Sequence, residues 1–289
     1  MKNTVTTKNV GVVVSCSSNE RLFIRAQLHE LLNCGCVSKV VYSAGSHTFD
    51  GAPETVLSDL RDVISESNSA RDVVHCVEYA VDTVVVKTQP YVFHNLSRVQ
   101  GLEALRSLMG GNNDFWVLLL DGDEIPNGRR LDEWFNSISE CLSPTVVYKL
   151  SCYWYFLDPR LRAKEFEDSI VMVHNTNIPA SVLAQDPRER DALVIASRGG
   201  CIRRIMDATS QPMFHHFSWV RPRSIMLKKI STWGHKDDTS RDWESIVREY
   251  WPAGVSVYDI NKLDLDTWRD PVHGYSYTLV PDEFVIINP

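Results

Sequence analysis

The sequence lacks any apolar run long enough to cross a bilayer, and its first ten residues lack the apolar segment of a signal peptide. It also lacks a basic tract, and its formal net charge of −7 disfavours nucleic acid as the main partner. These absences predict a cytoplasmic protein that has no transmembrane segment, is not secreted and does not bind nucleic acid. The sequence does not fix the oligomeric state.

No C-x-x-C pair occurs, and the seven cysteines are odd in number and scattered, which is typical of reduced thiols in a cytosolic protein. Cys34 and Cys36, separated by one glycine, are compatible with a metal or redox site. We favour the interpretation that they are two small buried residues at a helix end. The G-x-S-x-G motif of serine hydrolases and the P-loop motif G-x-x-x-x-G-K-[ST] are both absent, which argues against those two classes of enzyme.

The most informative stretch is FWVLLLDGDEIP. Residues 115–120 are six consecutive apolar residues, typical of a strand buried on both faces of a parallel sheet. Asp121, Asp123 and Glu124 follow directly, and ligands of open α/β sheets bind beyond the carboxyl ends of the strands. Two carboxylates one residue apart suit Mg²⁺ or Mn²⁺, and Gly122 between them would let a ligand approach the backbone closely. This motif therefore predicts a cation site that carries a nucleotide diphosphate.

The remaining patterns predict one α/β domain of alternating strands and helices, without internal repeats or a low-complexity linker. Ser17 and Glu20 have the spacing of a capping box at the start of the first helix. Residues 160–197 are charged and aperiodic and are predicted to form loops around a cleft. The predicted strands span residues 10–15, 39–43, 73–79, 83–86, 115–120, 146–157 and 284–287, and the predicted helices span residues 17–34, 53–66, 95–109, 127–138, 222–233 and 243–251.

Two further blocks allow more than one interpretation. The strand at 146–157 contains four consecutive aromatic residues, 153–156, which are either core residues or a platform for sugar rings. The helix that starts near Pro222 carries Lys228 and Lys229, and its basic residues form either an anion site or a solvated charged face. His215 and His216 precede this helix on a predicted strand, and an Asp and His ligand set suits Mn²⁺.

Taken together, V-G-V-V-V-S-C-S-S-N-E, R-V-Q-G-L, W-V-L-L-L-D-G-D-E-I-P and H-x-S-W, in this order, resemble nucleotide-sugar glycosyltransferases of the GT-A fold. The resemblance is to the family-2-like, DGDE-type group, which includes enzymes of large DNA viruses that glycosylate their own capsid proteins, and it covers about a third of the chain. It implies a Rossmann-like, mostly parallel central sheet flanked by helices, with a C-terminal helical elaboration. If the chain is viral, it would act in the host cytoplasm.

The resemblance also implies roles for individual residues. Asp121 would lie near the ribose and the metal, Asp123 would ligate the metal, and His216 would be a further ligand of the metal or diphosphate, with His215 as the alternative. The implied nucleotide-binding residues are Ser17, Ser18, Asn19, Arg98 and Asp121, and the anion site predicted on the basic helix adds Lys228 and Lys229.

The usual Glu-Asp pair that supplies the catalytic base of inverting enzymes is not identified from the pattern. The candidates are Asp158, Glu165, Asp168 and Asp207, of which Asp158 is preferred for its place beside the aromatic strand, although a turn residue before Pro159 is the competing interpretation.

The resulting prediction is a metal-dependent glycosyltransferase that uses Mn²⁺ or Mg²⁺ to move a sugar from a nucleotide sugar to a hydroxyl of a glycan or glycoprotein, with inversion. UDP is chosen as the nucleotide by analogy. The predicted catalytic domain is 1–238, with a nucleotide-sugar half at about 8–127 and an acceptor half at about 128–238, and 239–289 pack on it. The alternatives are a metal-dependent nucleotidyltransferase and a non-catalytic carbohydrate-binding protein.

Overall fold

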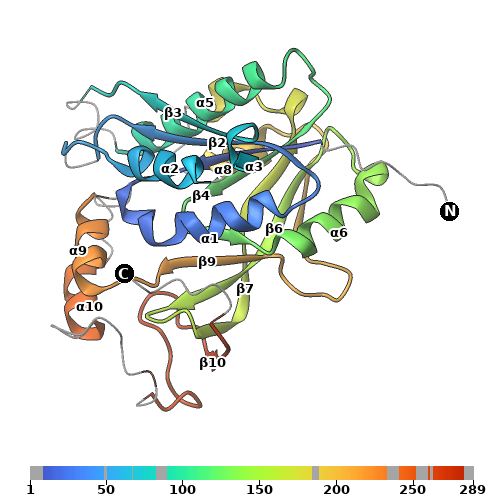
Figure 1. The fold of residues 1–289 in the computed structure, drawn as a ribbon. Coiled ribbons are helices and arrows are strands. Elements are labelled where there is room, and N and C mark those ends of the chain that lie inside the picture. The colour runs from blue at the N-terminus through green and yellow to red at the C-terminus, as the bar shows by residue number, and fades with distance from the viewer. Residues whose placement is uncertain are drawn as a thin grey trace.

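The structure is a computed structural model, which describes residues 9–48, 51–66, 68–82, 90–183, 189–232, 241–251, 260 and 263–282. No helix in these segments combines the length and the hydrophobicity that crossing a membrane requires. Among these segments, ten strands form one sheet in the order β3-β2-β1-β4-β7-β6-β9-β5, with β10 beside β7 and β8 beside β6 (Figure 1). The strands are β1 (Val10–Ser15), β2 (Val37–Gly45), β3 (Val74–Tyr79), β4 (Trp116–Asp121), β5 (Glu124–Pro126), β6 (Val147–Phe156), β7 (Leu161–His174), β8 (Cys201–Ile205), β9 (Phe214–Trp219) and β10 (Tyr277–Leu279).

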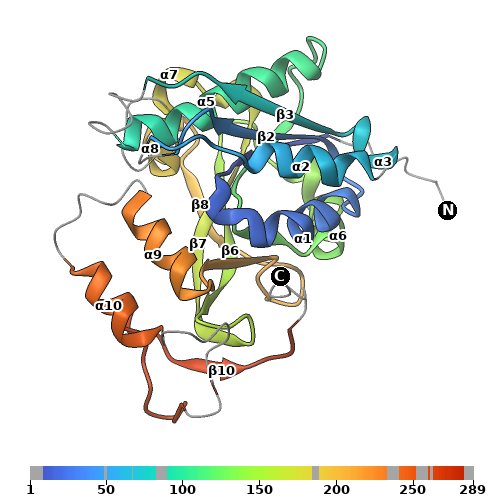
Figure 2. The ribbon, with the colours of Figure 1, turned by 60° about the vertical axis from the view of Figure 1, so that its left-hand side comes forward.

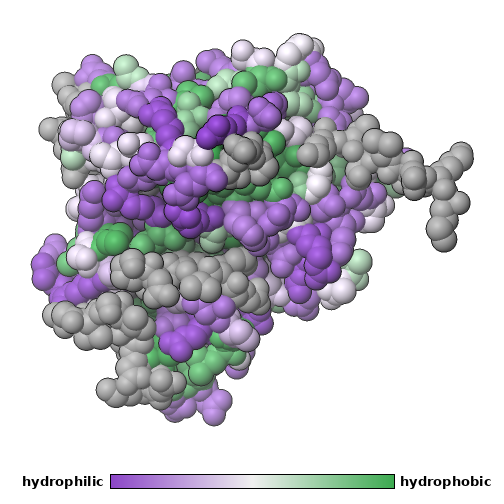
Figure 3. Space-filling model, in the orientation of Figure 1, coloured by the Kyte–Doolittle hydropathy of each residue, from purple (hydrophilic) through white to green (hydrophobic). Residues whose placement is uncertain are grey.

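Helices cover both faces of the sheet (Figure 2). The alternate residues of β1 belong to two separate cores, one on each face. Val12 and Val14 pack toward α1, α2 and α6, whereas Val13 packs toward α5, α7 and α8. The helices are α1 (Arg21–Leu32), α2 (Val56–Ser65), α3 (Asn68–Arg71), α5 (Pro90–Leu108), α6 (Gly128–Ile138), α7 (Ala180–Leu183), α8 (Glu189–Ala196), α9 (Arg223–Thr232) and α10 (Trp243–Tyr250), and the short 3-10 turns are η1 (Ser18–Glu20), η2 (Ser139–Cys141) and η3 (Asn175–Asn177). The outer faces of α1 and α6 are mainly hydrophilic, as expected of helices with one buried face (Figure 3).

The predicted α/β class is confirmed, and the sheet has two unlike halves. Strands β3, β2, β1 and β4 are all parallel, whereas β7 runs antiparallel to both β4 and β6. The capping box is present, with Ser17 and Glu20 each bonded to the other's backbone. The predicted strands at 83–86 and 284–287 lie outside the described residues, and the division into a nucleotide half and an acceptor half stays a prediction.

The prediction of loops for 160–197 is wrong. Residues Leu161–His174 form β7, a 14-residue strand at the centre of the sheet, and two helices follow it. The pairing of β7 with β6 contains two register shifts, which interrupt the alternation of apolar and polar residues that would have identified the strand.

The C-terminal helix α10 packs against α9 and the end of the sheet. Val247 and Trp251 join a buried cluster with Phe156 and Trp219, and the indole N–H of Trp251 donates to the Arg221 carbonyl oxygen at 3.0 Å. The end of α10 is therefore attached to the backbone of Arg221, two residues before α9 begins.

Helices α1 and α6 approach each other closely at Gly128. A Cβ atom at this position would lie 2.2 Å from the Glu30 carbonyl oxygen, and this backbone atom cannot move by a change of rotamer. We expect Gly128→Ala to lower the free energy of unfolding by about 1–3 kcal/mol because the helices must separate. Urea denaturation measures this loss, and the exposed substitution Asn136→Ala on the same helix is the control, expected to stay within about 0.5 kcal/mol of the parent.

Candidate active site

The acidic motif lies at the point where the order of the parallel strands reverses, between β1 and β4. Strand β1 pairs with β2 on one side and β4 on the other, and Ser15 and Asp121 face each other at their carboxyl ends. The loop after β1 and the DGDE motif therefore lie together at the carboxyl ends of the parallel strands. Open α/β sheets bind their ligands at this place. The structure gives Gly122 a packing role, because an added Cβ would lie 2.7 Å from the Glu20 Cβ, and the predicted approach of a ligand stays a prediction. Glycine is needed here for packing within the fold.

Asp121 belongs to a buried network of two acids and two arginines, Asp121, Glu124, Arg98 and Arg190, which we call the Asp121 cluster. The guanidinium groups of Arg98 and Arg190 donate to opposite oxygens of Asp121, at 2.5 and 3.1 Å. Arg190 also donates to both oxygens of Glu124, at 3.0 and 2.8 Å. Arg98 is 1% exposed, so its guanidinium positions Asp121 from within the fold. Arg190 was missed because it lies in the segment that was predicted to be irregular.

Asp123 belongs to a second network of five residues, Glu20, Asp123, His216, Arg221 and Lys229, which we call the Asp123 cluster. Its Oδ2 accepts from Arg221 at 2.7 Å and from Lys229 at 3.0 Å, and its Oδ1 lies 3.5 Å from the Nε2 atom of His216. Arg221 also lies 3.3 Å from Glu20 and stacks over the ring of Phe23. Residues from four segments of the chain thus converge on one buried carboxylate.

Opposing effects set the ionisation states in the Asp123 cluster. Burial alone would raise the pKa of Asp123, but the charge of Lys229 and the adjacent His216 outweigh it and hold the pKa well below the ordinary value. Burial alone would lower the pKa of His216, but Asp123 holds it well above the ordinary value. Burial, reinforced by Arg221, lowers the pKa of Lys229. The Asp123 carboxylate is therefore charged, and the cations Arg221, Lys229 and protonated His216 around it balance that charge.

The structure distinguishes the two adjacent histidines, because neighbouring residues of β9 face opposite sides of the sheet. His216 faces Asp123. His215 is 2% exposed, shares a 2.8 Å hydrogen bond between its Nδ1 atom and the Tyr155 hydroxyl, and packs beside the stacked rings of Tyr155 and Phe217. His215 is thus a core residue in the structure, and only His216 is placed beside the acidic motif.

Burial of His215 predicts a specific response to acid. Burial lowers its pKa to about 3, so the folded state keeps it neutral while the unfolded chain protonates it near pH 6.5. The stability that this group contributes is complete above about pH 6.5 and is lost as the pH falls toward 3. We expect His215→Asn, which does not titrate, to show a shallower loss of unfolding free energy between pH 6.5 and 5, by up to about 1.4 kcal/mol per pH unit. Equal slopes in the two proteins, measured by urea titration, would contradict this.

The loop after β1 contacts α9, as the sites predicted on both segments require. The Asn19 side chain donates to the Thr232 hydroxyl at 3.0 Å, and the Lys228 ammonium lies 3.4 Å from the Ser18 hydroxyl. Ser17 bonds to Glu20, and Asn19 is itself buried. Lys228 is exposed at this edge, whereas Lys229 is buried against Asp123. The structure thus brings together the predicted nucleotide loop and the two lysines.

The residues predicted to hold a metal come together only in part. Among the described residues, no three His, Cys, Asp or Glu side chains that lie within 4.8 Å of one another include Asp121 or Asp123. Asp121 instead has an arginine on each oxygen. Asp123 Oδ1 and His216 Nε2, at 3.5 Å, lie near the spacing of roughly 3.0 Å that neighbouring ligands of an octahedral ion at about 2.1 Å require. These two residues could hold a dication once His216 gives up its proton, with the remaining ligands supplied by phosphates or water.

The four aromatic residues of β6 do not form an exposed sugar platform. Tyr153, Trp154, Tyr155 and Phe156 are at most 4% exposed and pack in the core. Trp154 nevertheless lies beside the site, with its ring 4.7 Å from that of His216. The buried indole nitrogen of Trp154 lacks a hydrogen-bond partner among the described residues. The His216 ring also interacts with Cys152, so the indole N–H of Trp154 is the buried polar group beside it that lacks a partner in this part of the described chain.

Asp158 is a turn residue, and the structure does not support its predicted role as base. It is 2% exposed between β6 and β7, and both of its carboxylate oxygens accept from the Arg160 guanidinium at 2.9 Å. Asp207 is similarly held within its own turn by Thr209 and Gln211. Neither carboxylate is therefore placed to accept a proton from an acceptor.

Glu167 is the carboxylate that sequence reasoning missed. It is half-buried on β7, and its carboxylate lies within 4.8 Å of ligand atoms of His216 and Cys152. It also contacts the Tyr275 hydroxyl at 3.2 Å and His273 at 3.8 Å. The neighbouring Asp168 instead pairs with Arg203 at 3.2 Å. The Glu167-Asp168 dipeptide was a visible signal, but it lay in the segment that was predicted to be irregular.

No family model matches the sequence, and no curated protein matches it. Among solved structures, S. aureus TarS 1-349 in complex with UDP-GlcNAc is similar, with 12% identity, a TM-score of 0.44, and coverage of 83% of this chain and 70% of that chain. A 4-diphosphocytidyl-2C-methyl-D-erythritol synthase has 11% identity, a TM-score of 0.44 and coverage of 78% and 99%. A glycosyltransferase involved in the glycosylation of the major capsid of PBCV-1 has 11% identity, a TM-score of 0.35 and coverage of 72% and 92%. Because these TM-scores are below 0.5, the functional conclusion rests on the geometry of the site.

Proposed function

We propose that this chain is a dication-dependent glycosyltransferase that moves a sugar from a nucleoside-diphosphate sugar, with UDP as the nucleotide, to a hydroxyl of a glycan or glycoprotein, with inversion. The observation that carries the proposal is the Asp123 cluster. A charged, buried carboxylate faces an imidazole and two cations where β1 and β4 end. This arrangement can bind a diphosphate together with its cation, as the sequence resemblance implies.

Asp123 and His216 would hold the Mn²⁺ or Mg²⁺ ion. When bound, such an ion neutralises the negative charge that develops on a diphosphate leaving group. The Asp121 cluster has a separate task in this proposal. Its arginines fix the Asp121 carboxylate at the carboxyl end of β4, where the Asp121 side chain is 22% exposed and would contact the ribose.

Lys228 and the loop residues Ser17 to Asn19 would contact the nucleotide. The Lys228 ammonium is exposed beside Ser18, so it can approach a phosphate without leaving a buried partner unpaired. Lys229 holds Asp123 in place and adds positive charge below the site. A preorganised positive charge in a site of low dielectric stabilises a developing anion more strongly than water does.

Glu167 would act as the general base. In this proposal its carboxylate takes the proton from the acceptor hydroxyl as that oxygen attacks the anomeric carbon, and the diphosphate departs on the opposite side. The unpartnered indole N–H of Trp154 beside it can donate to an acceptor or donor sugar hydroxyl. This role replaces the one predicted for Asp158.

The proposal is tested by incubating the protein with a panel of UDP-sugars, with and without Mn²⁺, and measuring free UDP and the melting temperature. A UDP-sugar that binds only the folded state raises the melting temperature, by an amount that grows with its concentration relative to Kd. We expect stabilisation and slow UDP release that both require Mn²⁺. Release of pyrophosphate from a nucleoside triphosphate would instead identify a nucleotidyltransferase, and glycan binding without nucleotide binding would identify a carbohydrate-binding protein.

A further inference from the structure

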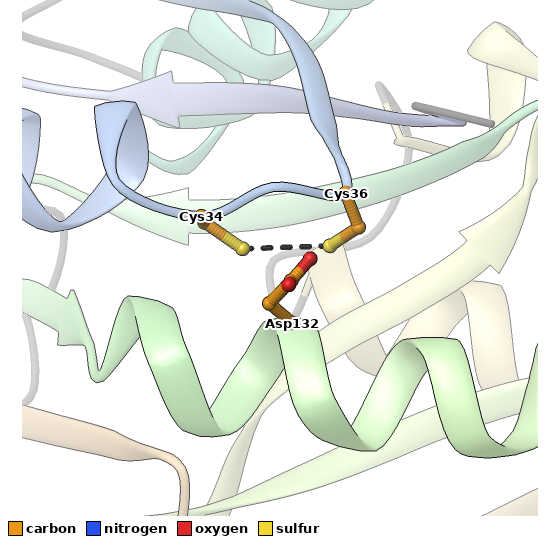
Figure 4. A group of neighbouring side chains, drawn as sticks. All are labelled: Cys34, Cys36 and Asp132. Carbon is orange, nitrogen blue, oxygen red and sulfur yellow. Dashed lines mark hydrogen bonds between the residues drawn. The ribbon is translucent and has the colours of Figure 1, made fainter. Parts of the chain in front are cut away.

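A second group of possible metal ligands lies where α1, β2 and α6 meet. Cys34 follows α1, Cys36 precedes β2, and Asp132 lies on α6. The three side chains point toward one another, and one ligand atom of each lies within 4.8 Å of the other two (Figure 4). The two sulfur atoms are 3.4 Å apart. None of these residues belongs to the site described above.

The backbone around the two cysteines is firmly held. The Cys36 carbonyl oxygen accepts from the amides of Asn9 and Val10, both at 3.1 Å, and the Cys34 carbonyl oxygen accepts from the Val37 amide at 3.1 Å. The thiols are 2% and 0% exposed. The sulfur positions are therefore set by the fold and need little rearrangement to bind a ligand.

The Asp132 carboxylate points toward the two cysteine thiols, although one of its oxygens lacks a hydrogen-bond partner there. Its Oδ1 atom is buried and has no hydrogen-bond partner among the described residues, which is unfavourable for a polar group and more so for a charged one. The carboxylate lies directly over Gly35, where an added Cβ would be 2.9 Å from Oδ1. The glycine between the two cysteines thus makes room for an unsatisfied acid beside two thiols.

We propose that Cys34, Cys36 and Asp132 bind a Zn²⁺ ion, with a water molecule as the fourth ligand. Two thiolates bound to one tetrahedral zinc at about 2.3 Å lie roughly 3.8 Å apart, close to the observed separation of the sulfur atoms. The half-buried side of Asp132 gives water access to the fourth position.

The ligand set selects the metal. Thiolates favour zinc and copper(I) over Mg²⁺ and Ca²⁺, which take oxygen ligands, and the carboxylate favours zinc over copper(I). The bound ion would join α6 to the end of α1 and the start of β2. Because α6 begins two residues after β5 ends, this junction supports one side of the active site without taking part in the reaction.

The proposal is tested on the full chain, purified without a metal-affinity tag, by adding Co²⁺ and then Zn²⁺. We expect a thiolate-to-cobalt charge-transfer band that Zn²⁺ abolishes by competition, and about one zinc per chain by elemental analysis. The band should disappear in Cys34→Ser and in Cys36→Ser. Asp132→Asn, a change of one atom at a half-buried helical position, should bind zinc on the order of tenfold more weakly or worse, as ligand-shell changes do.

Two matched controls locate the ion. Cys141→Ser removes an exposed thiol, and Cys152→Ser removes the thiol beside His216 and Glu167. Both variants should keep the cobalt band. The proposal is overturned if no band forms, if Cys152→Ser abolishes it, or if Asp132→Asn binds zinc as tightly as the parent. A mass two hydrogens lighter, mapped to a Cys34–Cys36 disulfide, would overturn it as well.

Discussion

Replacing Asp123 by Asn should abolish Mn²⁺-dependent binding and hydrolysis of UDP-sugars and should also lower the free energy of unfolding by about 3–5 kcal/mol. The loss of stability arises because Arg221 and Lys229 would remain buried beside a neutral amide. The loss of binding arises because a neutral amide is a weak ligand for a dication. Isothermal titration with Mn²⁺ and UDP, together with urea denaturation, measures both.

A second substitution separates the two effects. In the double variant Asp123→Asn with Lys229→Met, one buried cation is removed, so part of the lost stability should return while Mn²⁺-dependent binding stays absent. Asp121→Asn is the further comparison, because Asp121 faces arginines and should not be needed to hold the ion. If Asp123→Asn still bound UDP in a Mn²⁺-dependent manner, the assignment of the cation site would be wrong.

Replacing Glu167 by Gln should reduce kcat for sugar transfer by roughly 10²- to 10⁴-fold while leaving the affinity for the nucleotide sugar nearly unchanged. The amide keeps the shape of the side chain but cannot take up a proton. The loss should appear in kcat and not in KM for the donor, and the limb of the pH profile that reports the base should vanish. Steady-state kinetics with a transferable acceptor provide these values.

The adjacent Asp168→Asn is the matched control, because that carboxylate faces away and pairs with Arg203 near the surface. It should change kcat by less than about threefold, since exposed ion pairs contribute little. Retention of transfer in Glu167→Gln together with its loss in Asp168→Asn would reverse the assignment of the base.

Local sequence patterns identified the parallel half of the fold because each of its elements carries a complete signal. The run at 115–120, the capping box at Ser17 and the helical stripe on α6 each depend on residues close together in the chain. Strand β7 gave no such signal. Its middle is charged and its pairing with β6 shifts register twice, so only its neighbours in the sheet make it a strand.

The site was predictable to the same extent. The acidic motif was singled out because carboxylates that directly follow a fully apolar strand form an unusual local pattern, and His216 because of the family resemblance; their roles stay predictions. The sequence could not show that Asp121 faces two arginines while Asp123 faces His216, since those partners come from distant segments. For the same reason Arg190 and Glu167 were missed, and a turn residue, Asp158, was preferred as the base.

The short strand β5 has a consequence for how this site can vary. Glu124 lies opposite His216 and Ile125 opposite His215, and the Phe217 amide donates to the Asp123 carbonyl oxygen at 2.9 Å. Asp123 and His216 therefore belong to neighbouring residue pairs where β5 meets β9. Backbone hydrogen bonds set their alignment, so it does not depend on the neighbouring side chains. Inserting a single residue into β9 ahead of the histidines would shift the register of β9 by one residue. His216 would then point into the core, and His215 would face Asp123 instead.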